Sequence, residues 1–146
     1  MADWGYRNVG SPGDALDIKS ITVTPDPPKP GSTVTVRFDA AAMEKIEDGA
    51  YFDVVIKLGL VKLITRRYDI FAELRGGGAE GLKLSCDTSN GKSPIPKGNA
   101  VLTAVIDLPN EVPRAKFKVE VRAYTVDEGD LAALDFDLDL RPGFPA

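Results

Sequence analysis

Residues 117–124 read Phe-Lys-Val-Glu-Val-Arg-Ala-Tyr, and apolar and polar side chains alternate along this stretch. Successive side chains of a β-strand point to opposite faces of a sheet, so the alternation predicts a strand with one apolar and one wet face. The same period of two recurs in residues 33–38, 52–58, 100–108 and 134–140. Residues 18–23 and 60–74 are less regular strand candidates, and we expect roughly seven to eight strands in all.

The segments between the candidate strands are rich in turn-forming residues. Residues 25–31 read Pro-Asp-Pro-Pro-Lys-Pro-Gly, and because its four prolines cannot donate to a sheet, this segment predicts a stiff connection. Residues 40–48 predict one or two helical turns, with Asp39 as the N-cap and Gly49 just past the end. Short strands joined by such loops predict an all-β, immunoglobulin-like β-sandwich of two antiparallel sheets, folded as one domain over residues 1–146.

The amino-acid composition excludes several kinds of chemistry. The chain of 146 residues has no histidine and one cysteine, Cys86. It therefore cannot form a Ser-His-Asp or Cys-His nucleophile system, a His-ligated metal site, a Cys-cluster zinc site or an internal disulfide. The formal net charge of −4 argues against a nucleic-acid partner, which normally selects a basic surface. We expect a binding protein, not an enzyme, with no metal or cofactor.

Acidic residues recur near the C-terminus at every second position, as Asp135, Asp137 and Asp139. On a strand their side chains share one face at a spacing of about 6.5–7 Å, which is too wide for all three to bind one cation. We interpret them as a solvated strand face. A carboxylate pair of the kind used by glycoside hydrolases stays open as an alternative, because acids distant in sequence can converge on folding.

Basic residues gather between positions 57 and 67 of this acidic chain. Lys57, Lys62, Arg66 and Arg67 are interleaved with apolar residues such as Leu60. Such a mixture at a sheet edge can dock on an anionic membrane surface. It is also typical of an alternating strand whose basic face is simply solvated, so the pattern alone leaves both interpretations open.

The order of several short segments goes further than the composition. The chain contains, in this order, Asp-Ala-Leu-Asp-Ile-Lys-Ser-Ile (14–21), Thr-Pro-Asp-Pro-Pro-Lys-Pro-Gly (24–31), Ile-Glu-Asp-Gly-Ala-Tyr (46–51) and Lys-Leu-Gly-Leu-Val-Lys-Leu-Ile (57–64). This series resembles the ML lipid-recognition domain, and within it the fungal phosphatidylglycerol/phosphatidylinositol transfer proteins. The resemblance extends from Tyr6 to Leu140.

The sequence departs from that family at its cysteines. Arg7, Phe71, Ser93 and Ala133 stand where the family has cysteine. The resemblance implies that the first and last of these positions form one disulfide in the family and the middle two form another. Both partners of each disulfide are therefore missing here. Each lost bridge takes away about 2–4 kcal/mol, which the core must offset. A disulfide-free chain suggests a reducing compartment, so we expect a cytoplasmic protein, or a secreted or vacuolar one if the gene product carries a secretory signal.

The resemblance implies a non-enzymatic protein that binds or transfers a lipid, either a phospholipid or a sterol, held between the two sheets. The expected ligand-binding residues are inward-facing by alternation or lie nearer the mouth: Val36, Phe38, Val54, Ile56, Leu58, Leu60, Val61, Tyr68, Leu102, Ile106, Val119, Val121, Phe136 and Leu138. Lys62, Arg66 and Arg67 are the expected headgroup or membrane contacts. The rival interpretation is a filled sandwich that acts as a protein–protein interaction module, because alternation cannot distinguish a packed interior from a hollow one.

Overall fold

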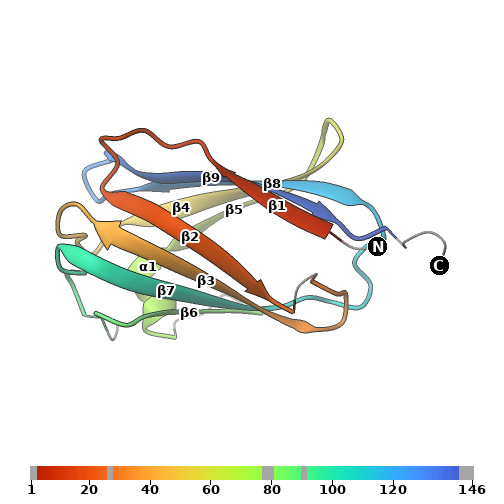
Figure 1. Cartoon of the computed structure of the whole chain (residues 1–146), viewed down its shortest axis with the longest axis horizontal. Coiled ribbons are helices and arrows are strands. Elements are labelled where there is room, and N and C mark those ends of the chain that lie inside the picture. The colour runs from red at the N-terminus through yellow and green to blue at the C-terminus, as the bar shows by residue number, and fades with distance from the viewer. Residues whose placement is uncertain (1–2, 26–27, 77–80, 90–91, 142–146) are drawn as a thin grey trace.

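The computed structural model describes residues 3–25, 28–76, 81–89 and 92–141, which form an all-β fold (Figure 1). These residues contain nine strands and one short helix. The strands are β1 (Asp3–Asn8), β2 (Leu16–Thr24), β3 (Thr33–Ala42), β4 (Tyr51–Leu58), β5 (Val61–Asp69), β6 (Leu82–Cys86), β7 (Gly98–Asp107), β8 (Lys116–Tyr124) and β9 (Asp130–Asp139). Helix α1 (Ile70–Leu74) lies between β5 and β6 in the chain.

The strands build two antiparallel sheets that face each other (Figure 1). The five-stranded sheet has the order β1-β9-β8-β4-β5, and the four-stranded sheet has the order β2-β3-β7-β6. Strands β5 and β6 end the two sheets on the side where α1 contacts both of them. The expected immunoglobulin-like sandwich is therefore confirmed, with slightly more strands than expected.

The strand registers gather the apolar side chains on the inner faces of the two sheets. In the five-stranded sheet, Val54 of β4 lies opposite Val121 of β8, which lies opposite Leu134 of β9. In the four-stranded sheet, Phe38 of β3 lies opposite Leu102 of β7. The period of two seen in the sequence is therefore the in–out alternation of a sandwich.

The end of the sandwich that carries α1 is closely packed. Phe71 of α1 is 0% exposed, and Ile46 and Ile95 from two loops are 2% and 1% exposed. These two loops hold each other through backbone hydrogen bonds, in which the nitrogen of Ile46 donates at 2.9 Å and that of Ile95 at 2.8 Å. The cluster continues into Ala50 and Leu131, so this end has a dense apolar core.

Two expectations about local structure are wrong. Residues 40–42 continue β3 and do not begin a helix, because Ala40 pairs with Ala100 of β7 and the ladder runs on to the strand end. Residues 70–74 leave the strand and form α1. The side chain of Asp69 accepts a hydrogen bond from the backbone nitrogen of Ala72 at 2.9 Å, which caps the helix and ends β5 there.

Candidate functional site

Away from the α1 end a second apolar cluster, which includes Val34 and Leu134, is buried, but several inner-face side chains of β4 and β8 are only partly covered. Val119 and Val121 lie on β8, the middle strand of the five-stranded sheet, yet both are only partly buried. Val54 and Ile56 of β4 are also partly buried, and Leu58 at the end of that strand is 37% exposed. Apolar residues in the centre of a packed sandwich are normally buried. This incompletely covered apolar surface is the candidate binding site.

Most of the predicted ligand-binding residues face the space between the sheets. By register and alternation these are Val36, Phe38, Val54, Ile56, Leu58, Tyr68, Leu102, Ile106, Val119, Val121, Phe136 and Leu138. Val36 is 9% exposed and the others are more accessible than that. The structure thus brings them together on two facing apolar surfaces, and their contact with a ligand stays a prediction.

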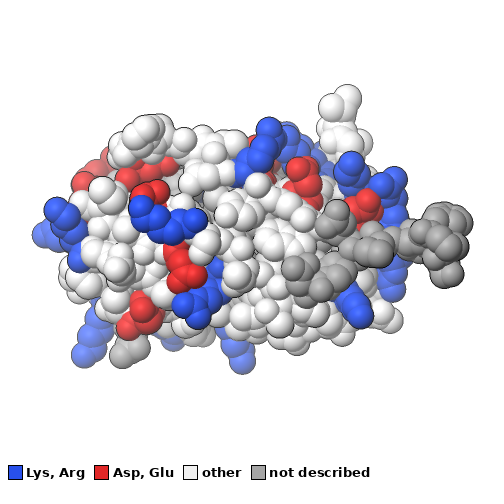
Figure 2. Space-filling view, in the orientation of Figure 1, with Lys and Arg blue, Asp and Glu red and all other residues white. Residues whose placement is uncertain are grey.

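The β4–β5 hairpin projects from the body of the molecule, and Figure 2 shows an uncharged projection there with basic side chains around its base. Gly59, with φ of +60°, opens the two-residue turn, a conformation that glycine adopts without strain. Leu60 at the tip is fully exposed, and Val61, Leu63 and Ile64 are 61%, 47% and 41% exposed. The predicted residues Leu60 and Val61 therefore lie on this projecting hairpin.

The predicted basic cluster is divided between two faces of the sheet. Arg67 lies on the outer face, where its Nε donates to Asp53 at 2.8 Å and its guanidinium lies 4.3 Å from the ring centre of Tyr51. The hydrogen bond to Asp53 raises the pKa of Arg67. Lys62 also lies on the outer face, because it pairs with the neighbouring lysine of β4. Arg66 lies opposite Val54 and so belongs to the inner face.

The residues Asp135, Asp137 and Asp139 of β9 lie on the outer face, and Asp135 and Asp139 contact separate arginines. Asp135 is 7% exposed, and its Oδ1 lies 2.9 Å from Nη1 of Arg122, while its Oδ2 lies 3.7 Å from Nη2 of Arg7. Asp139 accepts hydrogen bonds from Arg141, which hold the pKa of that carboxyl far below its usual value. The interpretation of a solvated strand face is wrong for Asp135, which is buried, and holds for Asp137, which is exposed.

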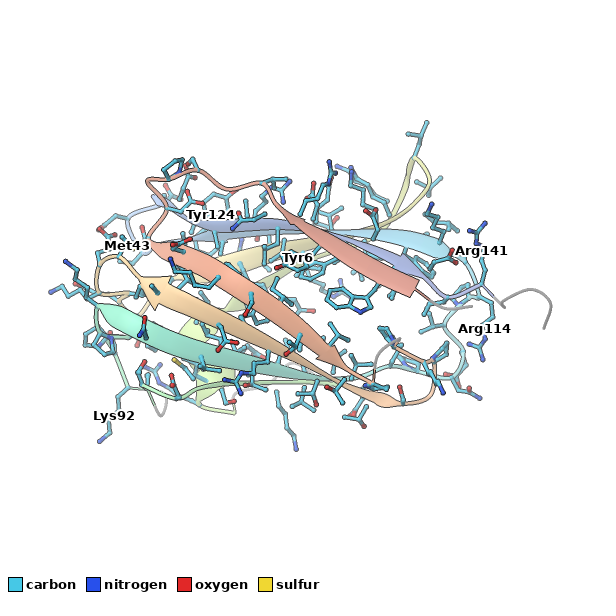
Figure 3. The ribbon with its side chains drawn as sticks, viewed as in Figure 1. Tyr6, Met43, Lys92, Arg114, Tyr124 and Arg141 are labelled. Atoms are coloured by element: carbon cyan, nitrogen blue, oxygen red, sulfur yellow. The ribbon has the colours of Figure 1, made fainter. Side chains whose placement is uncertain are left out.

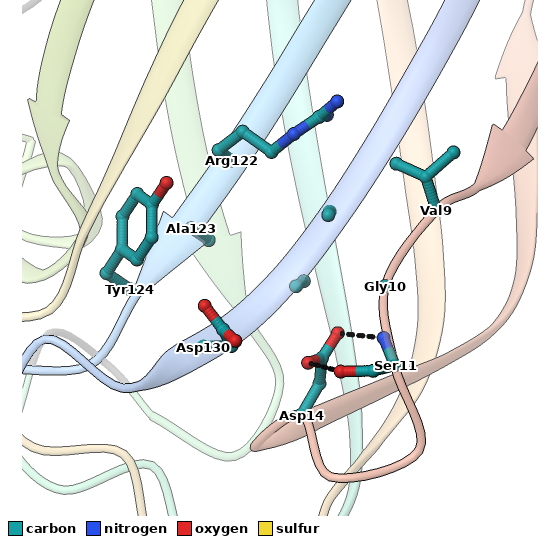
Figure 4. A pocket seen from close by; sticks show the side chains of 10 residues that line it. Val9, Gly10, Ser11, Asp14, Arg122, Ala123, Tyr124 and Asp130 are labelled. Atoms are coloured by element: carbon teal, nitrogen blue, oxygen red, sulfur yellow. Dashed lines mark hydrogen bonds between the residues drawn. The ribbon is translucent and has the colours of Figure 1, made fainter.

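Two small hollows lie beside the loop between β1 and β2, and Figure 4 shows one of them. It has a volume of about 190 Å³ and is lined by that loop together with Arg122 and Tyr124 of β8. Asp14 at its floor is buried and accepts hydrogen bonds from the backbone nitrogen and the Oγ of Ser11, each at 3.1 Å. The carboxylate is satisfied by its own loop, so we assign no ligand to this hollow.

Two features are absent from the part of the chain that the structure describes. No three Cys, Asp or Glu side chains there gather closely enough to hold a metal ion. No helix within the described residues is both long enough and apolar enough to cross a bilayer.

The sequence pattern did not predict β1 or β6, and β1 adds aromatic residues to the inner face. Trp4 lies opposite Leu138 of β9 and is partly buried. Its ring stacks with that of Tyr6, which is labelled in Figure 3, at a centroid distance of 6.1 Å, and the ring centroids of Tyr6 and Phe136 lie 6.3 Å apart. Gly5 between the two aromatic residues makes the alternation too short to stand out. The spacing Trp-Gly-Tyr is the signal that points to this strand.

Together, the fold and the inner surface define an immunoglobulin-like β-sandwich with an incompletely covered apolar interior. A family model described as the ML domain matches residues 9–140, and the chain belongs to this family. The phosphatidylglycerol/phosphatidylinositol transfer protein of Cryptococcus neoformans var. neoformans serotype D is 42% identical over 136 residues, which covers 93% of this chain and 70% of that protein. The protein of the same name from Mycosarcoma maydis is 33% identical over 141 residues, covering 97% and 67%.

Solved structures of low sequence identity share the fold. A Niemann-Pick type C2 protein from Japanese carpenter ant matches with a TM-score of 0.61 at 11% identity, covering 91% of this chain and 96% of that one. Chicken MD-1, crystallised with lipid IVa, matches with a TM-score of 0.51 at 16% identity, covering 94% and 98%. The family model and the fungal relatives confirm the family expected from the ordered sequence segments.

Proposed function

We propose that this protein binds the apolar part of a lipid between its two sheets and transfers the lipid between membranes, without catalysing a reaction. The observation that carries the proposal is the partial exposure of Val119 and Val121 in the middle strand of a sheet. An acyl chain lying against them would gain about 25 cal/mol for each Å² of apolar surface removed from water. The names of the fungal relatives, phosphatidylglycerol/phosphatidylinositol transfer proteins, support the same function.

Native mass spectrometry of the purified protein tests this proposal. We expect a bound mass in the phospholipid or sterol range that disappears after extraction with organic solvent. An empty protein that also fails to take up a fluorescent lipid would overturn the proposal. That result would favour the rival function, a filled sandwich that serves as a protein–protein interaction module.

We propose that the β4–β5 hairpin is the part that contacts the membrane. Four of its exposed apolar side chains, including Leu60 at the tip, gain free energy on leaving water, each about 1.5–3 kcal/mol if fully buried. A row of lysines crosses the outer face beside it, because in the strand register Lys57 of β4 lies opposite Lys118 of β8 and opposite Lys62 of β5. Glu120 offsets the charge of Lys57, with 3.1 Å between its Oε1 and the Nζ of the lysine. Exposed apolar residues next to cations suit the surface of an anionic membrane.

Co-flotation with vesicles that contain phosphatidylglycerol tests the membrane contact. We expect Leu60→Asp to reduce binding strongly, while Met43→Asp serves as a matched control because Met43 is 52% exposed near the packed end (Figure 3). Binding of the unmodified protein should also weaken as salt is added, because exposed charges are screened. Equal losses in both variants, or no dependence on salt, would show that the hairpin and its lysines are not the contact.

We also propose that the protein works in a reducing compartment such as the cytoplasm. The support is the replacement of the family's cysteines, among which Phe71 now fills the packed core and Ala133 lies on β9 beside β1. Cell fractionation of the tagged full-length gene product tests this, and recovery from the secretory pathway would contradict it.

A further inference from the structure

Two neighbouring arginines of β5 have different surroundings. The guanidinium of Arg67 is held on the outer face by Asp53 and Tyr51. Arg66 lies opposite Val54 on the inner face, because successive residues of a strand point to opposite sides. Arg66 is exposed, and no acidic side chain in the described ranges forms an ion pair or hydrogen bond with it. Nothing in these residues therefore gives its charge a structural role.

The surroundings of Arg66 on the inner face are apolar. Tyr68 lies on one side, stacked on Phe52 with 5.1 Å between the ring centroids, and Ile64 lies on the other, opposite Ile56. Strand β5 is also the edge of its sheet. A free guanidinium thus stands at the border between an apolar inner surface and water, where its apolar stem can cover the rim and its charged head can remain accessible.

We propose that Arg66 binds the phosphate of a phospholipid whose acyl chains lie between the two sheets. This inference rests on the proposed lipid-binding function. A guanidinium presents paired donors that match two phosphate oxygens, and such charge-assisted pairs are stronger than neutral hydrogen bonds. A sterol offers one neutral hydroxyl and leaves most of these donors in water. Arg66 therefore selects a phospholipid over a sterol or another neutral lipid.

The other two predicted headgroup residues do not share this position. Arg67 would have to leave Asp53 and the ring of Tyr51 to reach the inner face. Lys62 pairs with Lys57 on the outer face, near the hairpin, where it suits contact with a membrane surface. The structure thus separates recognition of the bound lipid, at Arg66, from contact with the membrane.

Calorimetric titration with two soluble short-chain lipids tests the role of Arg66 apart from membrane contact. The lipids are dioctanoyl phosphatidylglycerol and dioctanoylglycerol, which share their acyl chains and differ in the phosphate headgroup. We expect Arg66→Met to weaken binding of the phosphatidylglycerol roughly 10- to 100-fold and to leave binding of dioctanoylglycerol unchanged. Arg66→Lys should restore part of the loss, and Arg67→Met serves as the matched control that changes neither affinity by more than about twofold.

Each outcome bears on a different claim. Binding of both lipids with an unchanged ratio in Arg66→Met would overturn the role of Arg66 and leave the lipid-binding function intact. Binding of neither lipid by the unmodified protein would overturn both. Inorganic phosphate alone should give no measurable heat, because the apolar contact is missing, and saturable binding of that ion would point to a free-anion site and overturn the lipid assignment. Thermal unfolding of the variants confirms that they fold.

Discussion

The partly covered interior predicts that two enlarging substitutions in one strand change the stability by different amounts. Val119 and Ala123 both face the opposite sheet from β8, but Val119 is partly buried whereas Ala123 is 8% exposed and belongs to the packed end. Val119→Trp and Ala123→Phe add side-chain volume of comparable size. Extra volume in a close-packed core costs about 1–3 kcal/mol, while open apolar space accepts it at little cost. We expect Ala123→Phe to lose about 2 kcal/mol of stability and Val119→Trp to change it by less than about 1 kcal/mol.

The same tryptophan should compete with the lipid for the inner surface. A buried tryptophan covers roughly 150–250 Å². If about 100 Å² of that area is taken from the ligand, binding weakens by about 2.5 kcal/mol, which is roughly 70-fold in affinity. Val119→Trp should therefore keep the fold and lose the lipid.

Urea unfolding of the delipidated proteins measures the first effect, and uptake of a fluorescent lipid measures the second. The two readouts separate a blocked site from a damaged fold. Equal destabilisation by Val119→Trp and Ala123→Phe, with lipid uptake unaltered in both, would refute the reasoning. The interior would then be filled along its whole length, and the site would lie elsewhere.

Three further predictions concern other parts of the molecule. Phe71→Ala should cost about 3–5 kcal/mol in urea unfolding because the ring is fully buried, and a loss below about 1 kcal/mol would contradict the packed end. Hydrogen bonds from Arg141 lower the pKa of Asp139, so this ion pair stabilises the fold above about pH 4 and the stabilisation is lost in stronger acid. In a carbon-13 NMR titration, Arg141→Gln should raise the pKa of Asp139 toward its ordinary value, and an unchanged pKa would contradict the ion pair. Cys86 is 5% exposed, so a thiol reagent should react slowly in native buffer and fully in urea, whereas rapid native reaction would show that the thiol is open to solvent.

The strands and their inner faces could be predicted from the sequence because alternation is a local signal. Val119 and Val121 face inward for the same reason that their charged neighbours face outward, whatever the rest of the chain does. Strand β1 was not predicted because Gly5 interrupts a short alternating pattern, and α1 was not predicted because a single side chain, that of Asp69, ends β5. Both depend on single residues and not on a repeated period.

The degree of coverage and the division of the basic cluster could not be predicted. Whether Val119 is covered depends on how closely two sheets approach, which involves residues far apart in sequence. The faces of Lys62 and Arg66 depend on a register shift between Ile56 and Lys57, which leaves Leu63 out of the strand pairing. A bulge of this kind changes which residues share a face, so Lys62, Arg66 and Arg67 form one cluster in sequence and two in space.

The position of Trp4 gives the protein a built-in optical reporter. It is the single tryptophan of the chain, and it lies partly buried on the inner face of β1, opposite Leu138, where it packs against the apolar cluster that includes Val36 and Leu134. Indole emission shifts to shorter wavelength when water is replaced by an apolar neighbour. The emission wavelength of Trp4 should thus report the loading and release of a ligand in real time, without a fluorescent label on the protein.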